Sequence, residues 1–401
     1  MKDADIHHAF DGGGKRIYFD HCATTPMYEE VKDLLGSWLR SDFKNPSGLY
    51  KTSRILRRSL DDAREELAKE FFCRDTDIIF TSGGTESDNA AIYGLSGSRE
   101  SSVGEGLSPV IVSGIEHEAI LRPAQFLGAS VVNTHPNGSL DLDHLEDLLK
   151  LRKSADTVLK LVSIMAVNNE TGVIQPLSEA ADLVRSYFPD AFIHSDCVQA
   201  FSSRDIAETA ALADALSFSA HKFGGPIGVG ALVLKKQARK SFIPFMRGGQ
   251  QERGYRAGTE NLPAILGMAK AASLCATGKE TELKNLTLLA ERLLTGLKSI
   301  DSNISVVGRD SAKVAHIMLL HIPDIRGEEL CYLLDVEGIE VSTGSACAAG
   351  AREPSHVLLS MGWGTKEAKE VIRVSFGRTN TEAEVDEFLR KLQKAVRALR
   401  A

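Results

Sequence analysis

The sequence lacks several features that define other classes of protein. No apolar run approaches the roughly 20 residues that a membrane-spanning helix requires. The first five residues, MKDAD, do not begin a basic and then apolar export signal. The formal net charge of -7 argues against non-specific binding to nucleic acid or anionic membranes. Internal repeats and low-complexity segments are also missing, so we expect a cytoplasmic globular protein.

Cysteine is scarce, and its spacing excludes the common metal-binding motifs. No two cysteines form a C-x-x-C pair, so we expect no structural zinc site and no resident metal. Without an export signal the thiols should be reduced, and most should be small core residues. The six are Cys22, Cys73, Cys197, Cys275, Cys331 and Cys347.

The chain does contain a regular alternation of apolar strands and helical stretches. Its 401 residues are 43% hydrophobic and 25% charged, which is normal for a globular protein of two units. The predicted strands are 78–81, 110–113, 131–132, 159–165 and 192–194, and the predicted helices between them include 86–93, 119–127 and 178–187. This rhythm predicts an α/β fold with a mainly parallel sheet between helices. Ligands of such sheets bind at the carboxyl ends of the strands.

The last third of the chain predicts a smaller α+β unit. A long charged helix over residues 277–300 leads into it. Strands 314–320, 339–342 and 372–376 and helices 328–337 and 382–399 follow. We therefore expect a large domain over residues 28–278 and a small domain formed by residues 1–27 and 279–401.

The stretch 214–226 carries the first sign of chemistry. A short strand ends in S-A-H-K and then breaks at two glycines and a proline. A lysine just past a strand end, in a rigid turn, suits a Schiff base with a carbonyl group, and this predicts that role for Lys222. Ser219 and His221 could donate hydrogen bonds to a phosphate beside it. An ordinary loop has the same composition, so the other strand ends must decide.

Those strand ends carry side chains suited to a phosphorylated planar ring. The turn before Thr85 leaves free N–H groups at a helix start, which attract phosphate, although Thr85 and Asp88 could instead form a capping box. His117 could stack on a ring and transfer protons, or lie on the surface. Asp196 could keep a pyridine nitrogen protonated, with Gln199 on the phenolic oxygen, or simply start a loop.

Four features further along the chain could also belong to the site, and for three of them an ordinary structural role is the alternative. Asn169 could reach a ligand or belong to a turn. The Gly- and Arg-rich loop 247–261 could approach phosphate or be a solvated loop. Small residues flank Cys347, which indicates an accessible thiol and a candidate nucleophile or redox site. Arg373 lies inside an apolar strand and needs an anion, either a substrate carboxylate or an internal partner.

Together these parts are what pyridoxal phosphate chemistry on an amino acid requires. The chain resembles the cysteine desulfurases of the class-V, fold-type I aminotransferase family, and the matching stretches run from Tyr18 to Arg378. The most specific are residues 81–89, 219–222 and 252–259, and the G-S-A-C loop 344–347, whose form resembles the iron–sulfur-assembly branch of the family.

The resemblance implies a role for each matching residue. Lys222 would bind pyridoxal 5′-phosphate as a Schiff base and move the Cα proton, His117 would stack on the ring, and Cys347 would attack the substrate sulfur. Asn169 and Arg373 would hold the substrate carboxylate. The remaining cofactor-binding positions would be Gly84, Thr85, Asn169, Asp196, Gln199, Ser219 and His221, with Thr259 reaching the phosphate of a neighbouring subunit.

The resemblance also implies an activity and partners. L-cysteine would give L-alanine and a persulfide on Cys347, with His117 or another base accepting the thiol proton. The protein would be a homodimer that passes sulfur to an acceptor such as an iron–sulfur scaffold. The alternatives are a selenocysteine lyase, another class-V enzyme such as a transaminase, a catalytically silent cluster-assembly scaffold, and a thiol-only iron–sulfur or zinc carrier. Whether Cys347 also ligates a cluster transiently stays open.

Some positions depart from the family pattern. Tyr50 stands where a histidine is frequent, and Ala348–Arg352 replace a Thr/Ser-rich run. Cys22 and Cys197 replace small residues without a thiol. These changes leave the predicted cofactor set intact, but they bear on the choice of sulfur acceptor.

Overall fold

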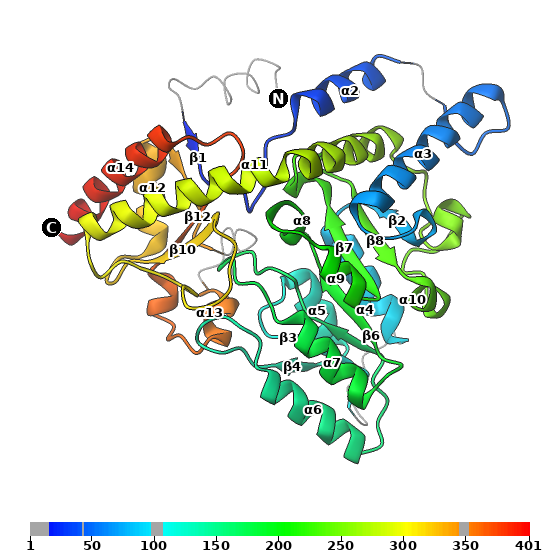
Figure 1. Cartoon of the computed structure of the whole chain (residues 1–401), viewed down its shortest axis with the longest axis horizontal. Helices are drawn as coiled ribbons and strands as arrows, with labels where there is room; N and C mark the ends of the chain where they lie inside the picture. Colours follow the sequence, from blue (N-terminus) through cyan, green and yellow to red (C-terminus); the bar gives the residue numbers. More distant parts are fainter. Residues whose placement is uncertain (1–15, 42–43, 98–106, 345–352) are drawn as a thin grey trace.

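The computed structural model describes residues 16–41, 44–97, 107–344 and 353–401 (Figure 1). Its main sheet has seven strands in the order β2-β8-β7-β6-β5-β3-β4. Only β8 runs antiparallel to its neighbours, so the predicted mainly parallel sheet is confirmed. The strands are β2 (Ile78–Thr81), β3 (Val110–Ser113), β4 (Ser130–Val132), β5 (Leu161–Ser163), β6 (Phe192–Asp196), β7 (Ala215–Ser219) and β8 (Gly230–Leu234).

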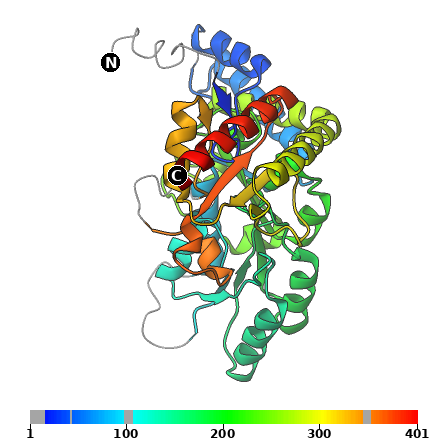
Figure 2. The same ribbon diagram turned by 90° about the vertical axis from the view of Figure 1, so that its left-hand side faces the viewer.

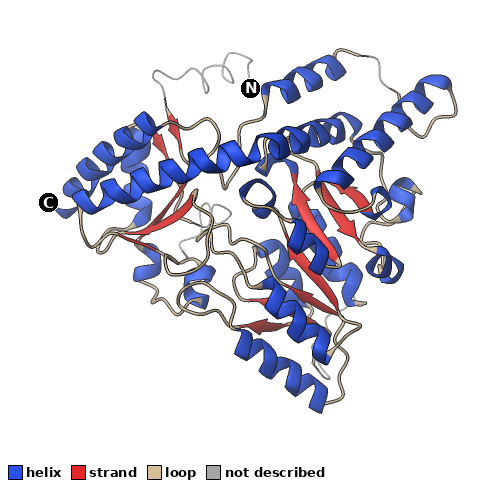
Figure 3. Cartoon of the chain, viewed as in Figure 1, coloured by secondary structure: helices blue, strands red, loops and turns tan. Residues whose placement is uncertain are grey.

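Helices cover the sheet on its two faces (Figure 3), which explains why β2, β3, β5, β7 and β8 are buried along their whole length. Helices α4 and α5 also pack against each other. The helices of this unit are α2 (Glu29–Leu39), α3 (Lys51–Glu70), α4 (Gly84–Ser96), α5 (Glu118–Phe126), α6 (Leu142–Ser154), α7 (Leu177–Tyr187), α8 (Ala200–Ser203), α9 (Ala207–Leu212) and α10 (Lys236–Ser241).

The second unit contains two small sheets. One has the order β12-β10-β9, and the other pairs β1 with β11 in parallel. Helix α14 (Glu382–Arg400) packs against α12 (Gly327–Val336) and α11 (Leu262–Ile300) beside them (Figure 2). The strands are β1 (Ile17–Tyr18), β9 (Ser305–Val306), β10 (Ile317–His321), β11 (Ile339–Glu340) and β12 (Val371–Ser375), and α13 (His356–Ser360) follows the Cys347 segment.

Helix α11 corrects the prediction for residues 277–300. It has 39 residues and begins at Leu262, where the Asn261 side chain caps Ala264 N–H. Its first part is buried against α2, α3 and α8, so it lacks the polar face that makes the second part recognisable. The helix runs unbroken through residue 278, so the two-domain division stays a prediction. No helix in the described part of the chain is long and apolar enough to cross a membrane.

A buried ion pair fastens the turn 251–254 to the large unit. Arg64 donates to the Glu252 carboxylate at 2.8 and 2.7 Å, and Phe80 N–H donates to it at 2.9 Å. Both charged residues are buried. Glu252 and Arg253 have positive φ angles of 46° and 57°, which cost energy for residues other than glycine. The pair therefore holds a strained turn, and the solvated-loop alternative for residues 247–261 is wrong at its centre.

We expect Glu252→Ala to lower the free energy of unfolding by about 3–5 kcal/mol, because Arg64 would be left as a buried unpaired charge. Urea unfolding of the apoprotein, followed by circular dichroism, measures the change. The matched control is Glu387→Ala, which removes a surface pair with Arg390 and should change little. Equal losses in the two variants would contradict a special role for the buried pair.

Candidate active site

One cavity of about 970 Å³ collects most of the predicted site residues. It opens near the carboxyl ends of parallel strands, the place where ligands bind in such folds. Its lining includes Gly84, Thr85, His117, Asn169, Asp196, Gln199, Ser219, His221, Lys222 and Arg373.

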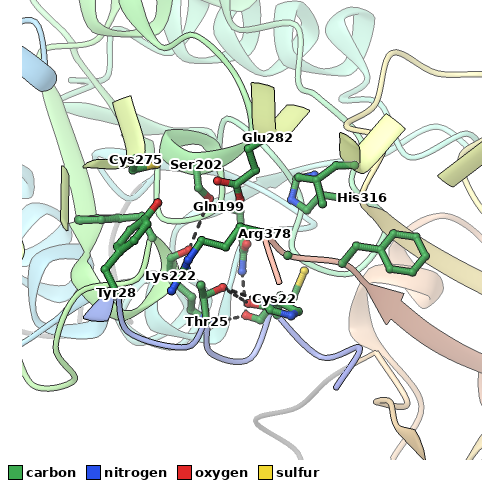
Figure 4. Close-up of a pocket in the computed structure, with 15 residues that line it drawn as sticks. Cys22, Thr25, Tyr28, Gln199, Ser202, Lys222, Cys275, Glu282, His316 and Arg378 are labelled. Carbon is green, nitrogen blue, oxygen red and sulfur yellow. Dashed lines mark hydrogen bonds between the residues drawn. The ribbon is translucent and has the colours of Figure 1, made fainter. Parts of the chain in front are cut away.

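Lys222 lies directly after β7, in the short 3₁₀ turn Ala220–Lys222. Its Nζ donates to the backbone oxygens of Cys22 and, at 2.9 Å, of Ala23. Gln199 Nε2 donates to the same Cys22 oxygen at 3.0 Å. The N-terminal segment thus reaches the lysine (Figure 4), which the sequence did not predict because about 200 residues separate the partners.

A second, smaller cavity lies behind Lys222 and shares that lysine and Gln199 with the larger one. Figure 4 shows Tyr28, His316 and Arg378 around it. Arg378 stacks over the Tyr28 ring, with 3.9 Å between its guanidinium carbon and the ring centroid. The lysine is therefore mounted between two cavities rather than in a solvated loop.

The start of α4 forms a cradle of backbone groups. The helix begins at Gly84, and Gly83 precedes it with a φ of 154° and no side-chain cap. The capping box of Thr85 and Asp88 considered above is therefore wrong. A Cβ at Gly84 would lie 2.9 Å from Val198 Cγ2, so only glycine brings the backbone this close to the cavity wall. The uncapped N–H groups suit an anion.

Asp196 ends β6 and is buried at the cavity floor. Its Oδ1 accepts a hydrogen bond from Val198 N–H at 2.8 Å. Asp196 therefore also starts the loop after β6, which was the alternative role considered for it. Burial raises the pKa of Asp196 to about 6, while the bond from Val198 and the nearby Lys222 oppose the rise. The carboxylate is thus held in one orientation.

His117 and His221, which both line the cavity, are neutral at physiological pH. Burial, with Lys222 adding to it, lowers the pKa of His117 and of His221 to about 4. His117 caps α5 by accepting from Ala119 N–H at 3.1 Å through Nδ1, so its neutral ring carries the proton on Nε2. The surface alternative for His117 is wrong. Proton uptake by Nδ1 would require the ring to give up this cap.

Arg373 lies in β12 and is 1% exposed. Its Nη2 donates to Asp20 at 2.7 Å, and its Nη1 donates to the backbone oxygens of Asn169 and Gly344 at 3.0 and 2.8 Å. Its Nε is buried without a partner among the described residues. The internal partner considered for Arg373 is therefore present, as Asp20, and a role toward a substrate carboxylate stays a prediction.

Two predicted residues are not among those that line the cavity, for different reasons. Cys347 falls outside the described residues, but Glu353 and Pro354, which follow that segment, line the cavity. Thr259 is exposed and does not line the cavity. Among the residues that the structure describes, no group of His, Cys, Asp and Glu side chains could hold a metal ion.

Sequence reasoning missed three acids, one that lines the cavity and two that contact its lining residues. Glu170 lines the cavity and accepts from Ser355 Oγ at 2.6 Å, near the end of the Cys347 segment. Glu116 is fully buried, and burial raises its pKa to about 8. Asp20 pairs with Arg373. Only the proximity of Glu170 to Asn169 in the chain could have indicated one of them.

Known proteins resemble the chain over nearly its whole length. The class-V aminotransferase family matches residues 17–388. An IscS-like cysteine desulfurase from Mycobacterium tuberculosis (strain ATCC 25618 / H37Rv) is 37% identical over 392 residues, which cover 96% of this chain and 97% of that protein. The solved structure of a NifS-like protein has a TM-score of 0.83 and 31% identity, covering 95% and 99% of the two chains. Another, titled SspA in complex with cysteine, has a TM-score of 0.75 and 26% identity, covering 92% and 100%.

The matches over nearly the whole chain show which family it belongs to. The chain belongs to the class-V aminotransferase family, an α/β fold of type I whose members depend on pyridoxal phosphate. Within that family it belongs to the cysteine desulfurases, as its full-length similarity to named members shows.

Proposed function

We propose that the protein removes sulfur from L-cysteine with bound pyridoxal 5′-phosphate, giving L-alanine and a persulfide on Cys347. One observation carries the proposal: Lys222 and Asp196, at the ends of the adjacent parallel strands β7 and β6, line one cavity together with Arg373. In this arrangement the amine can attach the cofactor, the carboxylate can pair with the ring nitrogen, and the guanidinium can bind the carboxylate of the amino acid. The relative solved with cysteine supports the choice of substrate.

The residues present fit pyridoxal phosphate. The uncapped start of α4, with Thr85, Ser219 and His221 beside it, suits the phosphate. Lys222 offers the amine, and Asp196 offers a fixed carboxylate for the ring nitrogen. When bound, pyridoxal phosphate would supply an electron sink for the negative charge that develops at the substrate Cα.

Side chains of the protein then carry out the proton transfers, orient the substrate and accept the sulfur. Lys222 removes the Cα proton and returns one to the product, while Asp196 keeps the ring nitrogen protonated and Arg373 orients the substrate carboxylate. The Cys347 thiolate attacks the substrate Sγ, and the Cβ–Sγ bond breaks with its electron pair left on Cβ. Cβ takes up a proton to become the methyl group of alanine, and the sulfur stays on Cys347 as a persulfide. The role of His117 is to stack on the ring.

We further propose a cytoplasmic homodimer with the two domains predicted above, in which Thr259 reaches the neighbouring subunit's phosphate site. Thr259 is exposed, and its loop is tied to the phosphate cradle because Arg256 Nε donates to Glu86 at 2.8 Å. A persulfide on Cys347 would then be passed to an acceptor protein such as an iron–sulfur scaffold.

The deciding experiment measures alanine and sulfide formation from L-cysteine in the presence of a reductant, with and without added pyridoxal phosphate. We expect equal amounts of both products and a dependence on the cofactor. L-selenocysteine run in parallel tests the lyase alternative, which predicts selenide release without sulfide release. Protein that takes up no cofactor and forms no alanine would overturn the proposal.

We expect Asp196→Asn to weaken pyridoxal phosphate binding by about 10- to 100-fold, because a hydrogen bond to a charged group is lost. In the wild type, binding should weaken as the pH falls through about 6, since Asp196 then takes up a proton and no longer pairs with the ring nitrogen. Absorbance titrations of the apoproteins across this range measure both effects. A variant that kept the wild-type pH dependence would contradict the role given to Asp196.

A further inference from the structure

A second buried carboxylate lies at the floor of the cavity. Asp88, in the second turn of α4, is 2% exposed and lines the cavity with Asp196. Its Oδ1 is buried and has no hydrogen-bond partner within the described part of the chain. Burying a carboxylate without pairing its charge is costly, so its presence here needs a reason.

Asp88 faces a row of polar side chains on the sheet. Alternate residues of a strand share a face, so His194 and Asp196 of β6 project to the same side, and Asp196 is the register partner of Ser217. His194 Nδ1 and Nε2 lie 2.9 Å from the hydroxyls of Ser163 and Ser217. The Nε2 atom is also 3.8 Å from Asp88 Oδ1.

The groups around Asp88 do not favour a negative charge on it. Burial lowers the pKa of His194 to about 3, so the imidazole is neutral and supplies no cation. Burial also raises the pKa of Asp88 well above its ordinary value, and Asp196 on β6 and Glu116 before α5 raise it further. The Ser217 hydroxyl opposes this only in part. An acid in such surroundings keeps its proton.

We propose that Asp88 is a positioning residue that stays neutral, presents an O–H group to the floor of the site and leaves Asp196 as the sole negative charge beneath the cofactor ring. Two neighbouring carboxylates that cannot both ionise share one proton in this way. The single negative charge that remains, on Asp196, then balances the single positive charge of the protonated ring nitrogen. The inference rests on the proposed function, because it requires Asp196 to face the pyridine nitrogen.

Two variants, Asp88→Asn and Asp88→Ala, test whether Asp88 acts as a neutral hydrogen-bond donor or as a second negative charge. Each apoprotein is titrated with pyridoxal phosphate, and the absorbance of the Lys222-bound cofactor is followed beside the wild type and Asp196→Asn. We expect Asp88→Asn to bind within about threefold of the wild type, since an amide N–H replaces the O–H at nearly the same volume. Asp88→Ala should bind about tenfold more weakly, because the site loses the O–H group that Asp88 presents to it.

Two results would overturn the inference. If Asp88→Asn weakens binding as much as Asp196→Asn does, Asp88 acts as a charge. If Asp88→Ala binds as well as the wild type, Asp88 positions nothing. Thermal unfolding of the apoproteins identifies a variant that does not fold, and Asp88→Asn alone still distinguishes a neutral from a charged residue. A wild type that takes up no pyridoxal phosphate would instead overturn the proposed function.

Discussion

Lys222→Ala should lose the formation of alanine and sulfide from L-cysteine by about 10³-fold or more, because one side chain both attaches the cofactor and moves the Cα proton. Its position supports both roles, since it is mounted after β7 and its Nζ is held by the backbone oxygens of Cys22 and Ala23. Amino-acid analysis for alanine and a sulfide assay give the rates. The absorbance band of the Lys222-bound cofactor should vanish as well.

The matched control is Lys236→Ala, which removes an exposed lysine at the start of α10. We expect it to retain the wild-type rate and absorbance. Thermal unfolding of both apoproteins should give similar midpoints, which would separate lost chemistry from lost folding. Full activity in Lys222→Ala would remove the basis for pyridoxal phosphate chemistry at this cavity.

Cys347→Ala should behave differently from the lysine variant. We expect it to bind pyridoxal phosphate with the wild-type absorbance while losing sulfide release by about 10³-fold or more, because the attacking thiol is gone and the cofactor residues remain. The readouts are a cofactor spectrum and a sulfide assay on the same sample. Mass spectrometry after exposure to L-cysteine should show one added sulfur atom in the wild type and none in the variant.

Cys73→Ala is the control for the thiol. Cys73 is half-buried after α3, and burial raises its pKa to about 12, so it stays in the unreactive thiol form. We expect unchanged sulfide release. Burial also raises the pKa of Cys22 and Cys197, so these extra thiols should label slowly. Sulfide release that survives in Cys347→Ala would transfer the nucleophile to another residue or indicate a lyase.

The cavity could be predicted largely because its residues come from strand ends. A polar residue directly after an apolar strand must emerge at the carboxyl edge of a parallel sheet, and this placed Lys222 and Asp196 before any contact was known. Arg373 was recognisable from the same kind of local contrast, a charge inside an apolar strand. Such signals need only the identity of the neighbouring residues in the chain.

Contacts between distant segments left no comparable signal. The antiparallel β8, the early start of α11 and the pairing of Arg373 with Asp20 each depend on which surfaces meet. Asp88 is the clearest case, because its spacing from Thr85 suggested a helix cap and the packing of α4 on the sheet buried it instead.

Strand periodicity and residue chemistry are local properties, so the α/β class could be read from the chain alone, and so could the prediction of a reactive amine with charges around it. How those groups are held, and which of them are charged, depends on the packing of the folded chain. Burial and the charges of residues far apart in the chain set the protonation of Asp88, Asp196 and His117.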